Sequence, residues 1–277
     1  MELPPMRHQH AQTVFFLPIF AALVMAGGAA LSAPRVAAAT LTVRYGASLM
    51  GVPVGKIKAS LSVEKRRYQA EGYAKASGFS RLFSDARVNV EATGTLTDAA
   101  EAQSYHRHWV EDGEAEDLSL SFEKGRVSDF RFKADKPGKQ YADRVPLKPE
   151  HKIGVIDPLS ALIMPIAGRH GKDLCKHRAP IFENNKRFDI IMRFARAERY
   201  HGGSKSYSGP VVVCAVRYVP IAGHRAQKKS ERFMAANKDM EVWLAPIETI
   251  GLAIPVKIRV RTEVGVLTAT ADRLKVQ

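Results

Sequence analysis

Apolar and polar side chains alternate along most of the chain after residue 40. The first run contains Leu41, Val43 and Tyr45, a turn with two glycines follows at 51–55, and the alternation resumes at 57–63. A period of two places successive side chains on opposite faces of a β-strand. The pattern therefore predicts a β-hairpin with one apolar face.

Similar strand patterns recur from residue 69 to residue 274, separated by turns that contain glycine or polar residues. They cover residues 69–75, 86–96, 104–111, 118–122, 127–133, 187–194, 210–218, 240–244, 253–261 and 265–274. Many short strands with few helices are typical of a mainly β protein. We expect an antiparallel sandwich or an open or closed barrel.

One short helix is predicted among the strands. Asp157 is a favourable N-cap residue, and Pro158 fits the first helical position. Apolar residues recur at helical spacing over 159–166, although Pro165 limits how far a regular helix extends. We expect this helix to pack its apolar side against the sheet, with Asp157 as its cap instead of a catalytic carboxylate. A second helical turn is predicted near Ser230.

The first 39 residues have the three parts of a secretory signal peptide. Arg7 lies in a short polar start, an apolar run covers 14–25, and small residues close the segment at Ala37 and Ala39. Export peptidases recognise small residues at these positions. We therefore predict cleavage after Ala39, which leaves Thr40 as the first residue of the exported protein.

An uncleaved membrane anchor is the alternative, because apolar or small residues continue over 14–31 and about 18 are needed to span a bilayer. Pro18 and two glycines within this stretch favour removal instead. No later segment of the sequence is apolar enough to cross a membrane. We expect a signal peptide over 1–39 and a single β-rich periplasmic domain over 40–277.

The sequence is strongly basic, with 42 Lys and Arg against 28 Asp and Glu and a formal net charge of +14. In a cytosolic protein this balance would point first to nucleic acid. For an exported protein we expect no nucleic-acid partner, and the favoured interpretation is charge that is scattered over the surface and serves solubility. The alternative is a specific anionic partner, such as phospholipid head groups or an envelope polymer, with contact at a membrane surface.

Lys257, Arg259 and Arg261 alternate with apolar residues on a predicted strand. Their spacing places three cations in a row on one face, which makes them candidate anion-binding residues. The alternative is a half-buried strand with one solvated face, which shows the same pattern.

The chain has two cysteines, Cys175 and Cys214. In an oxidising compartment we expect a disulfide, and closing a loop of about 40 residues contributes roughly 4 kcal/mol. Two alternatives stay open because His170, Asp173 and His177 lie close to Cys175 in the sequence. These are a metal site and a nucleophilic thiol.

Other candidate chemistry is sparse. His106 and His108 share one face of a predicted strand and would bind a metal only if a third ligand approached. The sequence contains no G-x-S-x-G, H-E-x-x-H or Gly-rich dinucleotide motif. We expect no enzymatic activity, no cofactor and no resident metal.

A set of short motifs extends through the sequence: Tyr45–Gly55, Tyr73–Gly78, Phe79–Phe83, Asp157–Ala161, Ile181–Asp189 and Ile254–Val260. These motifs resemble domain-of-unknown-function family 3108, exported bacterial proteins whose first hairpin carries a G-x-P-x-G turn. The resemblance covers nearly all of the chain after residue 39. One departure is Asn184–Asn185, where the family pattern has Asp-Gly, but asparagine also adopts left-handed turn geometry.

The resemblance implies a strongly curved antiparallel sheet or open barrel around one short helix, similar in outline to periplasmic lipoprotein carriers. We expect a non-enzymatic periplasmic protein of the cell envelope, either structural or binding an apolar or anionic envelope molecule, such as a lipid or an anionic polymer. The alternative is a hydrolase or metal-dependent enzyme that acts on envelope polymers through His106, His108 or the 170–177 segment.

Overall fold

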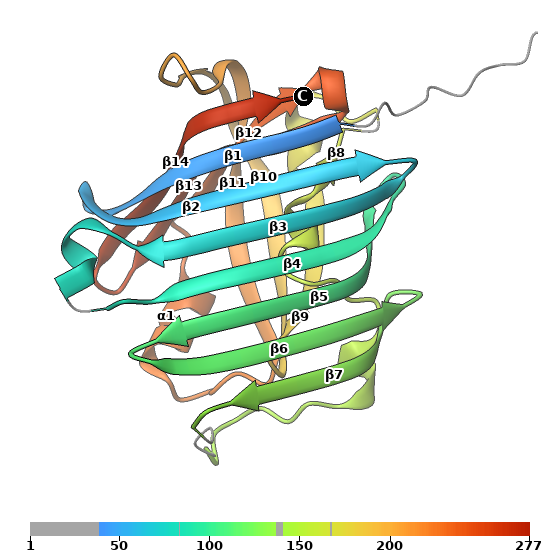
Figure 1. Ribbon diagram of the computed structural model, residues 1–277, viewed down its shortest axis with the longest axis vertical. Coiled ribbons are helices and arrows are strands. Elements are labelled where there is room, and N and C mark those ends of the chain that lie inside the picture. The colour runs from blue at the N-terminus through green and yellow to red at the C-terminus, as the bar shows by residue number, and fades with distance from the viewer. Residues whose placement is uncertain (1–38, 83, 137–140, 167) are drawn as a thin grey trace, which may run out of the picture. The chain divides into compact units, whose positions relative to one another are not determined.

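The computed structural model describes residues 39–82, 84–136, 141–166 and 168–277 (Figure 1). Across them, one 14-stranded antiparallel sheet has the strand order β7-β6-β5-β4-β3-β2-β1-β14-β13-β12-β11-β10-β9, and β8 pairs with β13 beside this path. The predicted signal segment lies outside the described residues, except for its last alanine, which begins β1. No helix in the described part of the chain has the length and hydropathy needed to span a bilayer.

The predicted mainly β class is confirmed, and each segment predicted as a strand coincides with one to within a residue at its start. The strands are β1 (Ala39–Leu49), β2 (Val52–Glu64), β3 (Arg67–Ala76), β4 (Arg87–Leu96), β5 (Ala100–Glu111), β6 (Glu114–Glu123), β7 (Arg126–Ala134), β8 (Met164–Pro165), β9 (His177–Glu183), β10 (Lys186–His201), β11 (Ser208–Ala222), β12 (Met240–Ile247), β13 (Leu252–Thr262) and β14 (Gly265–Val276). The helical elements are the α-helix α1 (Lys229–Ala236) and the 3-10 turns η1 (Gly78–Leu82), η2 (Pro149–Lys152), η3 (Ser160–Leu162), η4 (Gly171–Cys175) and η5 (Glu248–Ile250).

Two details of the strands differ from the sequence prediction. The turn between β1 and β2 is formed by Met50 and Gly51, with φ angles of 49° and 87°, so it precedes the predicted turn at 51–55. Strand β9 has no clear alternation and contains Pro180. Proline is tolerated there because β9 is the last strand at one end of the sheet and pairs on one side only with a neighbouring strand.

The sheet folds over its own apolar face. Strands β2 to β7 form one layer at the front of Figure 1, and β9 to β13 lie behind them at a steep angle. The layers are joined through β1, β14 and β13, which are hydrogen-bonded neighbours. Register shifts at Arg44/Tyr45 in β1 and Trp243/Leu244 in β12 mark bulges, which bend strands and increase their twist.

The two end strands of the sheet, β7 and β9, are both contacted by the segment 153–156. The Val155 amide donates to the Gly125 carbonyl at 3.0 Å, in the turn that leads into β7. The Ile156 amide donates to the Pro180 carbonyl at 2.9 Å, and the Phe182 amide donates to the Ile156 carbonyl at 3.0 Å. This segment therefore pairs with an otherwise open sheet edge and holds the two layers around a common interior.

The interior contains two clusters of buried apolar residues. The larger one includes Leu118, Leu120 and Phe182, which are at most 2% exposed. The smaller one surrounds a disulfide between Cys175 and Cys214, whose Cα atoms lie 5.4 Å apart. The predicted disulfide is thus present, and it fastens η4 to the buried strand β11.

The short helix predicted from Asp157 is present only as a single 3-10 turn, Ser160–Leu162. The Asp157 Oδ1 does accept the amides of Leu159 and Ser160, at 2.9 and 2.8 Å, as an N-cap would. The helical turn ends after Ser160–Leu162, because Ile163 is extended and Met164 and Pro165 pair with β13. Pro165 also lacks the N–H that a longer helix would need. The α-helix lies instead at α1, where the second helical turn was predicted.

The Asp157 carboxylate holds this turn inside the protein. It is fully buried, and its Oδ2 has no hydrogen-bond partner in the described part of the chain. Ser160, also fully buried, accepts a hydrogen bond of 2.6 Å from the hydroxyl of Tyr68 in β3. Burial raises the pKa of Asp157 from its ordinary value of 3.8 to about 6, and hydrogen bonds from Ser160 and Leu159 act in the opposite direction.

Replacing both cysteines by alanine should lower the free energy of unfolding by about 4 kcal/mol, because the open chain regains the entropy of a long loop. Both sulfur atoms belong to residues that are 0% exposed, so alanine introduces no buried polar group. Urea unfolding of both proteins measures the difference. Parent protein unfolded with a reductant should match the variant, and an unchanged midpoint in the variant would contradict this role.

Asp157→Asn keeps an oxygen for the cap and removes the titrating group. Because the pKa is about 6 in the folded state and near 3.8 in the unfolded state, the folded parent binds the extra proton between these values. The parent should therefore lose stability relative to Asp157→Asn as the pH rises from about 4 to about 6, by an amount on the order of 3 kcal/mol. Urea unfolding at several pH values tests this, and a constant difference would contradict the raised pKa.

Candidate functional site

Two apolar cavities lie on either side of the turn that contains Leu162. The first has a volume of about 260 Å³ and lies between β1–β4 and the beginning of β13. Its lining includes Val43, Ile57, Ala59, Ala74 and Ile254. Small side chains on β2 and β3 leave this space open, because the alternation places alanines on the inner face where larger residues would fill it.

The second cavity has a volume of about 310 Å³ and lies between the strands of the rear layer and α1. Its lining includes Ile181, Met192, Val216, Met234 and Val242. Methionine and branched aliphatic side chains give it an apolar wall that adapts in shape.

The two cavities share a wall. Leu162, Pro255 and Ile258 line both of them, so the turn held by Asp157 separates one cavity from the other. Leu162 belongs to this turn, and 50% of its surface is left uncovered by other protein atoms. An apolar ligand in either cavity would cover the exposed surface of this leucine.

Few polar groups reach these cavities. Tyr45 lines the first cavity, but its hydroxyl donates to the Pro255 carbonyl at 2.8 Å, and burial raises the pKa of Tyr45 above its usual range. His177 lines the second cavity, and burial, with the charge of Arg169 as a smaller cause, lowers the pKa of His177. The His177 ring is therefore neutral at pH 7. The charged residues of this lining are Glu241 and Arg259, and each forms an ion pair within the protein.

A third, more polar pocket of about 250 Å³ adjoins the second cavity. The two share Ala161, His177 and Ala179, and the third pocket is also lined by Arg169 and Arg178. Apolar and basic linings therefore meet at His177. This juxtaposition suits a molecule with an apolar chain and a polar or anionic end.

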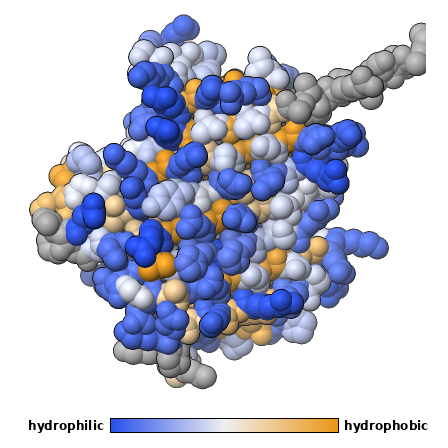
Figure 2. Space-filling view, in the orientation of Figure 1, coloured by the Kyte–Doolittle hydropathy of each residue, from blue (hydrophilic) through white to orange (hydrophobic). Residues whose placement is uncertain are grey.

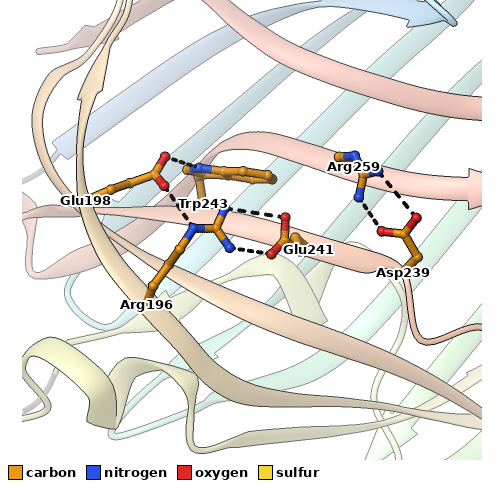
Figure 3. Close-up of polar contacts among 6 residues, drawn as sticks. All are labelled: Arg196, Glu198, Asp239, Glu241, Trp243 and Arg259. Carbon is orange, nitrogen blue, oxygen red and sulfur yellow. Dashed lines mark hydrogen bonds and ion pairs between the residues drawn. The ribbon is translucent and has the colours of Figure 1, made fainter.

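Two cations of the candidate anion-binding row contact other side chains of the protein, as Figure 3 shows for Arg259. Lys257 Nζ lies 4.5 Å from the centroid of the Trp243 ring, and Arg259 forms an ion pair with Asp239. Arg261 is exposed. Two of the three cations are thus already engaged within the protein, so a polyanion would have to compete with these contacts.

The side chains around Trp243 form a network of hydrogen bonds and ion pairs that connects neighbouring strands. Trp243 Nε1 donates to Glu198 at 2.5 Å, and Arg196 binds both Glu198 and Glu241 (Figure 3). Register shifts at Phe194/Arg196 and Trp243/Leu244 place this network beside two bulges. Its contacts hold the bent strands β10, β12 and β13 together.

The other predicted chemical sites are not brought together as a metal centre. His108 Nδ1 and His106 Nε2 lie 2.9 and 3.5 Å from the same Asp117 oxygen, and the hydrogen bond with His108 is the largest cause that lowers the pKa of Asp117. Over the described ranges, no group of three or more His, Cys, Asp and Glu is placed to hold a metal ion. The predicted alternatives for Cys175, a metal ligand or a nucleophilic thiol, are wrong because its sulfur is bonded to Cys214.

The sequence predicts that an apolar or anionic molecule binds in the concavity of the sheet, but it does not locate the two cavities. Alternation identifies the inner face of each strand, but the space between two layers depends on how sharply the sheet bends. The alanines at 59, 70 and 74 are a sequence signal of an incompletely filled interior.

Comparison with solved structures finds proteins of similar outline. One is a beta-barrel-like protein of the domain of unknown function DUF1849 from Brucella abortus, with 8% sequence identity, coverage of 87% of this chain and 98% of that chain, and a TM-score of 0.48. Another is a lipoprotein candidate from Parabacteroides distasonis, with 7% identity, coverage of 85% and 94%, and a TM-score of 0.32. At these values neither neighbour informs the function of this chain.

Among curated proteins, none matches the chain. A family model does match, over residues 40–272, and its description is a protein of unknown function, DUF3108. This is the family that the hairpin, cap and strand motifs predicted, and the chain belongs to it.

Proposed function

We propose that this is an exported, non-enzymatic protein of the cell envelope that holds the apolar chain of an amphiphile in its interior cavities. Leu162 supports this proposal, because it lies between two adjoining apolar cavities and 50% of its surface is not covered by other protein atoms. Export rests on the predicted signal peptide, and periplasmic localisation follows from it.

The size of the cavities supports a ligand with an extended apolar part. An apolar cavity of about 150 Å³ stays dry and binds benzene. The cavities here measure about 260 and 310 Å³, and they lie on either side of one leucine. Each therefore has room for an apolar group larger than benzene, and Leu162 would contact an apolar group in either cavity.

The polarity of the linings supports an amphiphile over a hydrocarbon. The basic lining of the third pocket, with Arg169 and Arg178, begins where the apolar lining of the second cavity ends. Arg178 is bound to Asp189 at 2.5 Å, whereas the Arg169 side chain donates to the Pro165 carbonyl. Arg169 is thus the cation best placed for an anionic or polar head group.

Ala59→Phe tests the proposal, because Ala59 lines the first cavity and a phenyl ring would occupy its space. Binding of a fluorescent long-chain fatty acid, measured by titration in the absence of vesicles, should weaken by at least about tenfold, which corresponds to about 1.4 kcal/mol. Parent protein should bind the probe with a saturable signal.

Ser62→Phe is the matched control, since Ser62 lies on the same strand, is exposed and alternates with the buried Leu61 and Val63. This variant adds the same ring to the outer face and should bind the probe as the parent does. Equal binding by all three proteins, or no saturable binding by the parent, would overturn the proposal.

A further inference from the structure

One end of the sheet carries a group of exposed apolar side chains, which we name the apolar tip. It comprises Met50, Val52, Phe79, Val264 and Leu267, with exposures of 69%, 47%, 58%, 70% and 37%. Hydrophobic atoms gather at the left-hand end of the face shown in Figure 2. Contiguous exposed apolar groups of this kind mark sites of interaction with proteins or membranes.

The apolar tip is one surface although its residues come from three segments. The Met50 amide donates to the Val266 carbonyl at 2.8 Å, which joins the β1–β2 turn to the β13–β14 turn. A Cβ atom at Gly265 would lie 2.6 Å from Met50 Cγ, so the two turns are in close contact. Ser80 Oγ donates to the Val54 carbonyl at 2.5 Å, which fastens η1 to the beginning of β2.

The backbone geometry of the β1–β2 turn does not explain why residue 50 is a methionine. A two-residue hairpin turn with positive φ at both positions favours Asn-Gly or Asp-Gly. Here the residues are Met50 and Gly51, with φ of 49° and 87°, and the methionine side chain is 69% exposed. The sequence thus places a large apolar side chain where turn geometry prefers asparagine and where no core covers it.

Basic side chains lie directly behind the apolar tip. Lys56, Lys75 and Arg87 are direct cross-strand neighbours on β2, β3 and β4, and all three are exposed. Within the part of the chain that the structure describes, none of the three forms an ion pair. Like charges directly opposite one another destabilise a sheet, and an anionic surface would relieve this repulsion.

The apolar tip is continuous with the lining of the first cavity. Ile258, Ala269 and Ala47 are cross-strand partners, and the first two line that cavity. Two residues further along the same face, Leu267 pairs with Leu49. One apolar face therefore extends from the first cavity to the exposed end of the sheet.

We propose that the apolar tip docks on a bilayer that contains anionic phospholipid, with the tip side chains in the interfacial region and the Lys56, Lys75 and Arg87 row against the head groups. An apolar patch with flanking cations binds membranes through both contributions. A second part of this inference rests on the proposed function: the docked end is where an amphiphile passes between the bilayer and the first cavity.

Vesicle flotation tests the docking. The tested variant is Met50→Asn with Val264→Asn, which removes two apolar side chains and leaves the turn with a residue that tolerates positive φ. On vesicles containing phosphatidylglycerol, its binding should fall by at least about tenfold relative to the parent. Parent and variant share the same N-terminal segment, so the difference reports the apolar tip.

The control is Phe132→Asn with Val219→Asn, which removes two exposed apolar side chains from β7 and β11, away from the tip. This control should bind the vesicles as the parent does. Parent binding should also weaken with added salt and on purely zwitterionic vesicles, because part of it is electrostatic. Equal binding by parent and tip variant, or no binding by the parent, would overturn the docking.

The fatty-acid titration without vesicles separates the two proposals. The tip variant should bind the probe in solution as the parent does, and its transfer of the probe from vesicles should slow in proportion to its lost docking. Docking without probe binding would refute the cavity function and leave the apolar tip in place. Transfer at the parental rate despite lost docking would refute the tip as the entry point.

Discussion

The buried carboxylate of Asp157 determines how the interior is divided. Its hydrogen bonds to Leu159 and Ser160, together with the bond from Tyr68 to Ser160, hold a single helical turn between the layers of the sheet. That turn carries Leu162, which lines both cavities. Because the carboxylate is buried with one oxygen unpartnered, the site favours the protonated form and its hold on the turn depends on pH.

Much of the fold could be predicted from the sequence because its signals are local. The alternation of apolar and polar residues located most of the strands. The disulfide was predicted because an exported protein with two cysteines is exposed to an oxidising compartment. The Asp157 cap could also be predicted. The early end of its helix could not, because the pairing of Met164 and Pro165 with β13 is a long-range contact. Strand β9 was missed for the same reason: its hydrogen bonds to its neighbours, not its pattern, make it a strand.

The candidate site was less predictable, because a cavity is a property of two layers and their angle. The charge pattern shows the same limit. Lys257 and Arg259 belong to the candidate anion-binding row of the sequence, but Trp243 and Asp239 contact them in the structure. The row without ion pairs, with Lys56 and Arg87 on either side of Lys75, comes from three strands and emerges only when their register is known.

Whether the cavities hold an amphiphile can be measured by native mass spectrometry of protein purified without detergent from its own cells. We expect a population that carries about one equivalent of bound lipid-like mass, which is lost on denaturation and identified in the organic extract. Protein that carries stoichiometric zinc and no lipid-like mass would contradict the proposed binding of an amphiphile.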